Sequence, residues 1–356
     1  MAYVGKINAR SPFYITATGS AFITSAELAV YIWEGTTAGK PASPNYTITK
    51  SALTATSTNI IFQISDLIRD SFDHDNDAYT ASASSFADAL WVEIELDVVQ
   101  TTDPQPSQVN NLYLAVDGYG YHSEAINPQG TDVIVNTMNV LSGEDISHPV
   151  YANSDGIDEV KYYSSTGSLQ TTVDLSTPVA SAYSYDKMQY LTRTAASNTY
   201  SFELLDGSVV QETVTINYEV DCKYPTKAIK FLDRNGMLQK IYMFKKSMES
   251  INSQADNYNA IGGYISSNEY VYDVTKHQNK TFNITSEENI TCNSGYVLEA
   301  QNEVFKQILL SEQVWVDDKP VSVGTRSMQY KTKINDRLIN YTIEFKYAND
   351  TVNNIY

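Results

Sequence analysis

The sequence predicts an all-β protein built from tandem β-sandwich-like domains, with one short helix in the C-terminal domain. Segments in which apolar and polar residues alternate strictly recur along the chain, a period typical of strands with one wet face. Tyrosine occurs 27 times, beside abundant Thr, Ser, Asn and Val, as expected of strands and polar turns. The 356 residues are enough for two or three domains, and we expect three.

The first domain is expected over residues 1–150. Residues 26–33 and 90–99 both alternate, and residues 65–72 predict a single helical turn. In the second of these strands, valine, isoleucine and leucine alternate with Glu93, Glu95 and Asp97. Acids two apart share a face and could pair for glycan cleavage, but the favoured interpretation is the solvated face of an edge or outer strand.

A small middle β domain is expected over residues 151–224. Residues 165–168 and the pair Asp206-Gly207 each separate two strand-like runs, which predicts two hairpins. The second hairpin leads into a long alternating strand over residues 209–220.

The C-terminal domain is expected over residues 225–356. Asn235-Gly236 lies between two apolar runs and predicts a hairpin with a type I′ turn, in which both central residues need positive φ. Residues 297–310 carry apolar side chains at helical spacing, and residues 338–347 alternate as clearly as any strand in the chain.

Charge and cysteine usage exclude several classes of protein. Asp and Glu number 42 against 24 Lys and Arg, a formal charge of -18 that repels phosphate backbones and anionic lipid. We therefore expect no nucleic-acid partner. Two cysteines, Cys222 and Cys292, are too few for a disulfide framework or a four-ligand zinc site.

Residues 1–10 resemble no signal peptide and no segment is apolar enough to span a bilayer, so membrane insertion is not expected.

Motifs that carry chemistry are weak. Residues 73–77 alternate acids like a calcium loop, but Ala78 and Ser84 stand where such a loop needs Gly and Glu. The histidines stand apart in sequence, without a catalytic or metal-binding signature beside them. We therefore predict no enzyme, and no catalytic, cofactor-binding or metal-binding residues.

Tyrosine clusters are the candidate functional residues. Tyrosine buries a large rigid surface and keeps one polar handle, so clustered tyrosines anchor protein interfaces or stack on sugars. We favour a protein interface, with ordinary strand packing as the alternative for any one of them. The candidate interface residues are Tyr119, Tyr121, Tyr264, Tyr270 and Tyr272.

Three stretches resemble virion structural proteins of tailed bacteriophages, particularly phages of Bacteroidota-like hosts. They are residues 10–15 with 62–70, residues 228–247, and residues 294–316 with 333–348. The last is similar to the C-terminal domain of tail and baseplate-type proteins, whereas Asn235 stands where the family more often has Tyr.

The resemblance implies a tail, baseplate or neck component. Such a chain would be assembled in the bacterial host cytoplasm and kept in the virion, with other virion proteins and copies of itself as partners. The alternative is a fibre or decoration protein that binds a host receptor or surface glycan. A glycan-degrading enzyme is the least favoured interpretation.

Overall fold

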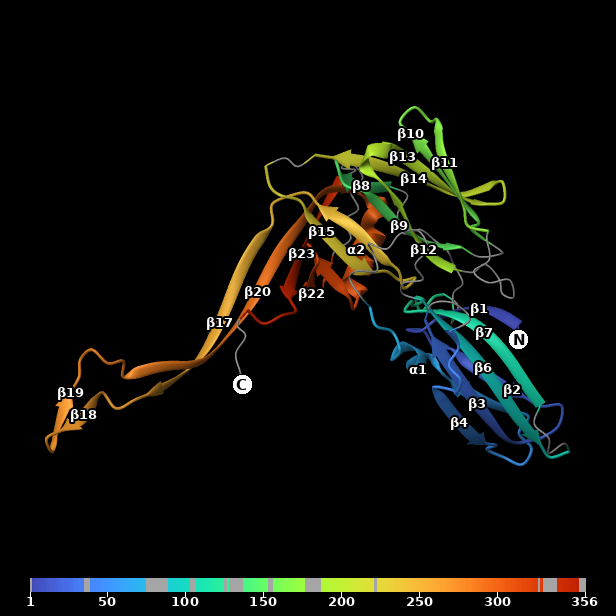
Figure 1. The fold of residues 1–356 in the computed structure, drawn as a ribbon, viewed down its shortest axis with the longest axis horizontal. Coiled ribbons are helices and arrows are strands. Elements are labelled where there is room, and N and C mark those ends of the chain that lie inside the picture. The colour runs from blue at the N-terminus through green and yellow to red at the C-terminus, as the bar shows by residue number, and fades with distance from the viewer. Residues whose placement is uncertain are drawn as a thin grey trace.

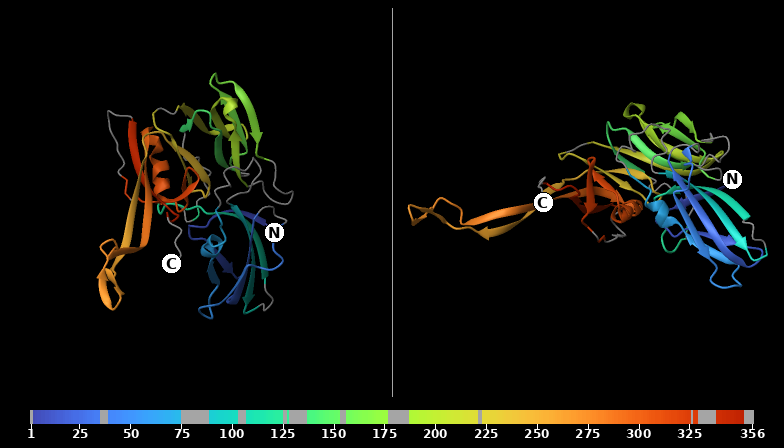
Figure 2. Two further views of the ribbon diagram at one scale, coloured as in Figure 1. Left: turned by 60° about the vertical axis from the view of Figure 1, so that its left-hand side comes forward. Right: turned by 60° about the horizontal axis from the view of Figure 1, so that its bottom comes forward.

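The computed structural model describes residues 2–34, 39–74, 89–102, 107–124, 127, 137–152, 156–176, 187–220, 223–325, 327–328 and 338–351. Strands dominate these ranges and helices are few and short, which confirms the all-β prediction. Figure 1 shows three β units and a long two-stranded arm that projects away from them. The arm also stands clear of the body in both views of Figure 2.

The first unit packs a five-stranded sheet against a two-stranded sheet and a short helix. Leu28 and Ile94 of the large sheet meet Phe62 and Ile68 of the other layer in a buried core. The large sheet runs β1 (Ala2–Asn8), β7 (Ser107–Val116), β6 (Ala89–Gln100), β3 (Ile23–Trp33) and β4 (Tyr46–Ser51). The other layer is β2 (Tyr14–Thr18), β5 (Asn59–Gln63) and α1 (Ser65–Arg69).

The acids of β6 correct one expectation. β6 is the central strand of its sheet, and Glu93 is 1% exposed. Lys40 Nζ lies 2.7 Å from Glu93 Oε1 and 3.0 Å from Glu95 Oε1. Glu93 therefore does not lie on a solvated outer strand. Its burial is tolerated because a cation compensates its charge.

The middle unit is a sandwich of a five-stranded and a two-stranded sheet. His148, Tyr162 and Phe202 stack inside it. The large sheet runs β11 (Leu169–Asp174), β10 (Glu159–Ser164), β13 (Thr199–Asp206), β14 (Val209–Glu219) and β8 (Thr137–Leu141), and the small one pairs β12 (Lys187–Arg193) with β9 (Ile146–Ala152). A short 3-10 helix, η3 (Ala195–Ser197), precedes β13.

The boundary expected at residue 150 is wrong, because it cuts through β9. β8 pairs in parallel with β14, and β9 pairs with β12. Both strands precede residue 153 in sequence but belong to the middle unit. The two predicted hairpins, β10–β11 and β13–β14, are confirmed, with Gly167 and Gly207 at positive φ in their turns.

The C-terminal unit is a seven-stranded sheet with one helix against it. Val304, Phe305 and Ile308 of the helix pack on Ile290 and Phe345 of the sheet. The sheet runs β16 (Leu238–Met243), β15 (Lys227–Leu232), β21 (Val314–Val316), β22 (Lys319–Val323), β23 (Leu338–Tyr347), β20 (Asn279–Leu298) and β17 (Met248–Asn259). The helix is α2 (Asn302–Leu310), preceded by η4 (Glu299–Gln301).

Two details differ from the prediction for this unit. The helix begins at Asn302 instead of residue 297, because Val297 pairs with Ile339 as the end of β20. The Asn235-Gly236 hairpin is confirmed, but only Gly236 has positive φ. The Gly236 N–H donates to the Asp233 carbonyl, 3.1 Å away, so the turn is a type I turn followed by a left-handed glycine.

Candidate functional site

Tyr119 and Tyr121 lie where the first unit meets the C-terminal unit. The Tyr119 N–H donates to the Arg234 carbonyl at 2.8 Å. The Tyr121 hydroxyl donates to the Glu303 carboxylate, and Lys306 Nζ lies 3.5 Å from the centre of the Tyr121 ring. Both tyrosines therefore join two parts of one chain, and their place at an interface between molecules stays a prediction.

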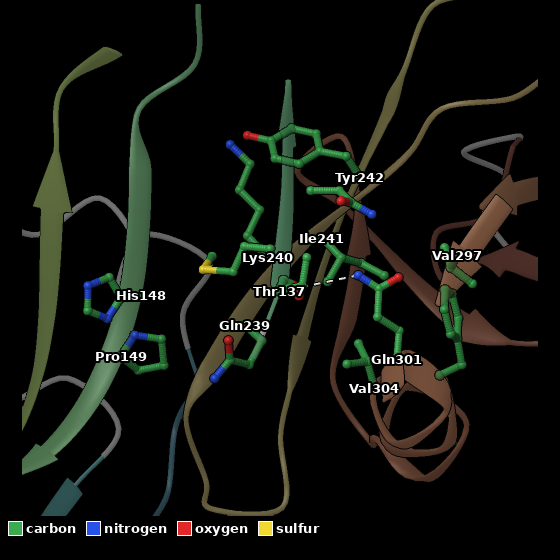
Figure 3. Close-up of a pocket in the computed structure, with 13 residues that line it drawn as sticks. Thr137, His148, Pro149, Gln239, Lys240, Ile241, Tyr242, Val297, Gln301 and Val304 are labelled. Carbon is green, nitrogen blue, oxygen red and sulfur yellow. Dashed lines mark hydrogen bonds between the residues drawn. The ribbon is translucent and has the colours of Figure 1, made fainter. Parts of the chain in front are cut away.

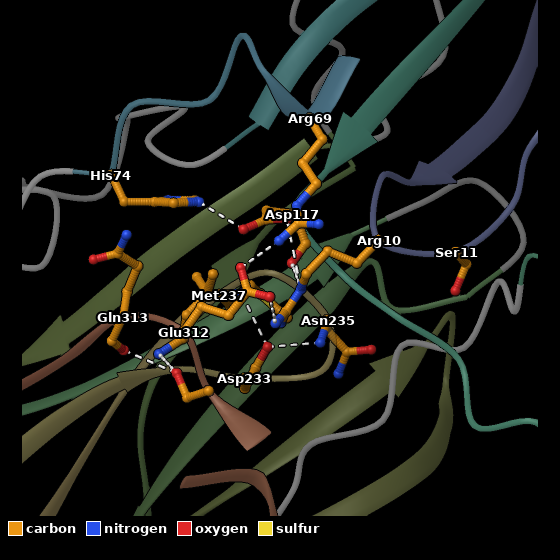
Figure 4. Close-up of polar contacts among 12 residues, drawn as sticks. Arg10, Ser11, Arg69, His74, Asp117, Asp233, Asn235, Met237, Glu312 and Gln313 are labelled. Atoms are coloured by element: carbon orange, nitrogen blue, oxygen red, sulfur yellow. Dashed lines mark hydrogen bonds and ion pairs between the residues drawn. The ribbon is translucent and has the colours of Figure 1, made fainter. Parts of the chain in front are cut away.

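Ion pairs reinforce this junction, as Figure 4 shows. Arg10 Nε donates to the Asp117 carbonyl at 3.1 Å, and its guanidinium lies 3.9 Å from Glu312. Arg69 pairs with the same Glu312. His74 Nε2 lies 3.0 Å from Asp117 Oδ2. Glu312 of the C-terminal unit thus pairs with two arginines of the first unit, while Asp117 holds Arg10 and His74 within the first unit.

The Asp233 turn fits closely into the first unit. A Cβ built on Gly236 would lie 2.7 Å from the Asp117 nitrogen, closer than real Cβ atoms approach backbone. The Asp233 carboxylate is fully buried and accepts from the Asn235 N–H at 2.7 Å and the Met237 N–H at 2.9 Å (Figure 4). It also accepts from Gln239 Nε2 at 3.0 Å. Desolvation outweighs these hydrogen bonds and raises the pKa of Asp233 to about 6.

This burial predicts a pH dependence that Asp233→Asn removes. The folded protein binds the Asp233 proton more tightly than the unfolded chain, so protonation of Asp233 stabilises the fold fully below about pH 4. This stabilisation, on the order of 3 kcal/mol at about 1.4 kcal/mol per pH unit, is lost as the pH rises to about 6. The amide introduced by Asp233→Asn would keep an oxygen for both backbone donors and would not titrate, so stability should fall less between pH 4 and 7.

Denaturant unfolding at pH 4, 5, 6 and 7 measures this difference. Asp206→Asn, at an exposed position, is the matched control and should keep the wild-type pH profile. A wild-type profile in Asp233→Asn would contradict the assignment.

A small cavity lies between the middle and C-terminal units (Figure 3). Its volume is about 50 Å³, and Ile241, Val304 and Phe305 line it from the C-terminal side. Gln301 Nε2 crosses it and donates to the Thr137 carbonyl at 3.1 Å. The space suits a few water molecules and is far smaller than the pockets of roughly 300 Å³ or more that hold organic ligands.

His148, beside this cavity, is held neutral. Its ring stacks on Phe202 with centroids 4.0 Å apart, and its Nε2 lies 2.9 Å from the Tyr162 hydroxyl. Desolvation by burial lowers the pKa of His148 to about 3. The residue therefore belongs to the core of the middle sandwich.

The projecting arm is made by β17 and the outer part of β20. β23 pairs with β20 only from Asn289 onward, so beyond that point β20 pairs with β17 alone. Every residue of β17 is exposed. The register shifts between Ala255 and Asp256, where Asn283 of β20 has φ 49° and forms a bulge. Bulges bend strands, and Figure 1 shows the arm turning along its length.

A second hairpin, β18 (Gly263–Ser266) with β19 (Glu269–Tyr272), forms the tip of the arm. Its two-residue turn, Ser267-Asn268, has positive φ at both positions, as a type I′ turn requires. A Cβ on Gly263 would lie 2.6 Å from the Tyr270 ring, so only glycine lets that ring cover the strand.

Three predicted tyrosines come together at this tip. Tyr264, Tyr270 and Tyr272 are 49%, 53% and 67% exposed. The rings of Tyr270 and Tyr272 meet edge to face with centroids 6.1 Å apart. The neighbouring Ile261 and Ile265 are exposed as well and were not predicted, although two isoleucines beside a tyrosine cluster are a signal visible in the sequence.

The remaining sequence motifs have these outcomes. Most of the calcium-like loop and Cys222 lie outside the described residues, whereas Cys292 is buried in the C-terminal core. In the ranges that the structure describes, no three His, Cys, Asp or Glu side chains are grouped to hold a metal ion. Within the same ranges no helix is long and apolar enough to cross a bilayer.

Comparisons with known proteins add little. No protein-family model matches the chain, and no curated protein matches it. One solved structure with partial similarity is the crystal structure of calcium binding domain CBD12 of CALX1.1. It is 12% identical, and the match covers 57% of this chain and 76% of that one. The TM-score is 0.17, so this similarity carries no argument.

Proposed function

We propose that this chain is a structural component of a tailed-phage particle, in its tail, baseplate or neck, and that it assembles through its β-arm. The exposed apolar side chains of the arm carry this proposal. They are Met248, Ile251, Tyr258, Ile261, Tyr264, Ile265, Tyr270, Val271, Tyr272, Val274, Phe282 and Ile284. A two-stranded ribbon is marginally stable alone in water, and contiguous exposed apolar surface marks interaction sites.

The body of the protein supports the same role. Ion pairs and a buried turn join the first unit to the C-terminal unit, so the arm projects from a body whose parts are held together. The resemblance of residues 294–316 and 333–348 to tail and baseplate-type proteins supports a place in the virion. The expected partners are other virion proteins and further copies of this chain.

A second candidate function is favoured by the aromatic tip. Tyr270 and Tyr272 present exposed rings side by side, and such rings also stack on sugars. In that case the chain would be a fibre or decoration protein that binds a host surface glycan. Retention on a host-glycan array, abolished by Tyr272→Ala, would favour this function over assembly.

Mass spectrometry of purified phage particles, separated into heads and tails, tests the proposed function. We expect the chain in the tail fraction, at a copy ratio that is a multiple of three or six. Recovery with heads would contradict a tail or baseplate position and favour a neck or decoration role. Absence from both fractions would contradict a virion role altogether.

A further inference from the structure

The free edge of β17 carries few of the features that usually prevent edge pairing, since its only charged residues are Glu249 and Asp256. β17 is the last strand of its sheet, runs for 12 residues without a register break of its own, and contains no Pro, Lys or Arg. Monomeric proteins commonly protect such edges with bulges, prolines or lysines. The free edge of β20 in the arm carries two of these, the bulge at Asn283 and Lys280. β17 is therefore the edge of the arm that is open to another strand.

We propose that β17 pairs with β17 of a second copy, antiparallel, about a two-fold axis at Ser253. This inference rests on the proposed function, since it names the partner of the arm. A two-fold contact is self-complementary, so each residue meets its counterpart across the axis. The result is a four-stranded ribbon in which two arms protect each other's open edge.

The register follows from the side chains. Opposite residues of an antiparallel pair share a face, and like polarity favours pairing while like charge opposes it. About Ser253, the apolar residues meet apolar ones and the acids meet neutral polar ones. The pairs are Met248 with Tyr258, Glu249 with Asn257, Ser250 with Asp256, Ile251 with Ala255, Asn252 with Gln254, and Ser253 with itself.

The neighbouring two-fold registers are worse. With the axis at Asn252, Met248 would face Asp256 and Ile251 would face Ser253. With the axis at Gln254, Ile251 would face Asn257 and Ser250 would face Tyr258. In the proposed register, Glu249 faces Asn257 of the second copy. Asp256 of that copy is next to Asn257, but its side chain points to the opposite face of the sheet, because successive residues of a strand alternate.

Disulfide trapping of the purified full-length chain tests both partner and register. In a Cys222→Ser background, Ser253→Cys places two thiols opposite each other across the axis, within the Cα separation that a disulfide spans. Ser250→Cys is the matched control, since its symmetry mate lies six positions away, about 20 Å. Under mild oxidation we expect Ser253→Cys to form covalent dimer at least tenfold faster. Equal rates, or a faster control, would overturn the proposal.

Sedimentation equilibrium gives a second measurement that does not depend on oxidation. Ile251→Lys places a charge within the paired edge and should weaken the dimer at least tenfold. Val209→Lys changes an equally exposed apolar side chain, 60% exposed like Ile251, but in β14 of the middle unit, and should leave dimerisation as in the wild type. A monomeric wild-type chain, or equal effects of the two variants, would overturn the proposal.

These results are separable from the test of the proposed function. A chain found in tails but not cross-linked at Ser253 overturns the pairing and leaves the virion role. A chain cross-linked at Ser253 but absent from particles overturns the virion role and leaves the pairing.

Discussion

Trp91→Ala is expected to lower the free energy of unfolding by about 3–5 kcal/mol, as truncation of a large buried aromatic side chain does. Trp91 is 1% exposed. Its cluster contains Tyr151 and Met188 from the middle unit and Met237 from the C-terminal unit. The cavity would therefore open where all three units meet, and the first unit should unfold at lower denaturant than the rest.

Far-ultraviolet circular dichroism in a urea series measures this effect without relying on tryptophan fluorescence. Leu53→Ala, at a side chain that is 98% exposed, is the control and should change stability by less than about 0.5 kcal/mol. Limited proteolysis should release a fragment of the first unit from Trp91→Ala only. An unchanged urea midpoint would show that the three units do not share this cluster.

The double variant Tyr264→Ala, Tyr270→Ala is expected to reduce incorporation into particles at least 30-fold, equivalent to about 2 kcal/mol. Tyr264 is opposite Val271 and Tyr270 is opposite Ile265, so the two rings lie on opposite faces of the tip hairpin. The variant therefore removes an anchor from each face at once. Because both side chains are half exposed, the isolated fold should keep its stability.

Competition between tagged variant and wild-type chains during particle assembly, read by mass spectrometry, measures this loss. Tyr296→Ala is the matched control, since Tyr296 is 69% exposed but lies outside the arm tip. It should enter particles like the wild type. Normal incorporation of the double variant would refute the role of the tip in assembly, while leaving open a contact made by β17.

Local patterns were sufficient for much of the fold. The alternation of residues 338–347 matches β23, and the turn residues near Gly167, Gly207 and Gly236 matched three hairpins. These features depend on interactions between residues close in sequence, which a periodic pattern records directly. The type of the turn at Asn235 did not follow, because the loop between Asp233 and Met237 has three residues, and such loops take a type I turn followed by a left-handed glycine.

Features that depend on distant pairing escaped the sequence. Residues 297–298 have helical spacing but extend β20, because β23 offers backbone partners there. The alternation around Glu93 predicts a solvated acid, yet Lys40 compensates it in a buried position. The assignment of β8 and β9 to the middle unit likewise depends on partners more than 30 residues away in sequence.

The tyrosine clusters show the same division. Their number and spacing indicated interfaces, and chemistry alone supports that interpretation for any exposed tyrosine. The tertiary structure decided where each one lies: Tyr119 and Tyr121 face the chain's own C-terminal unit, whereas Tyr264, Tyr270 and Tyr272 project at the end of the arm. Alternation indicates that a strand has one polar face, but it does not identify what lies against the other face. The arm is exposed because β23 pairs with β20 only from Asn289 onward, and this pairing is a feature of the tertiary structure.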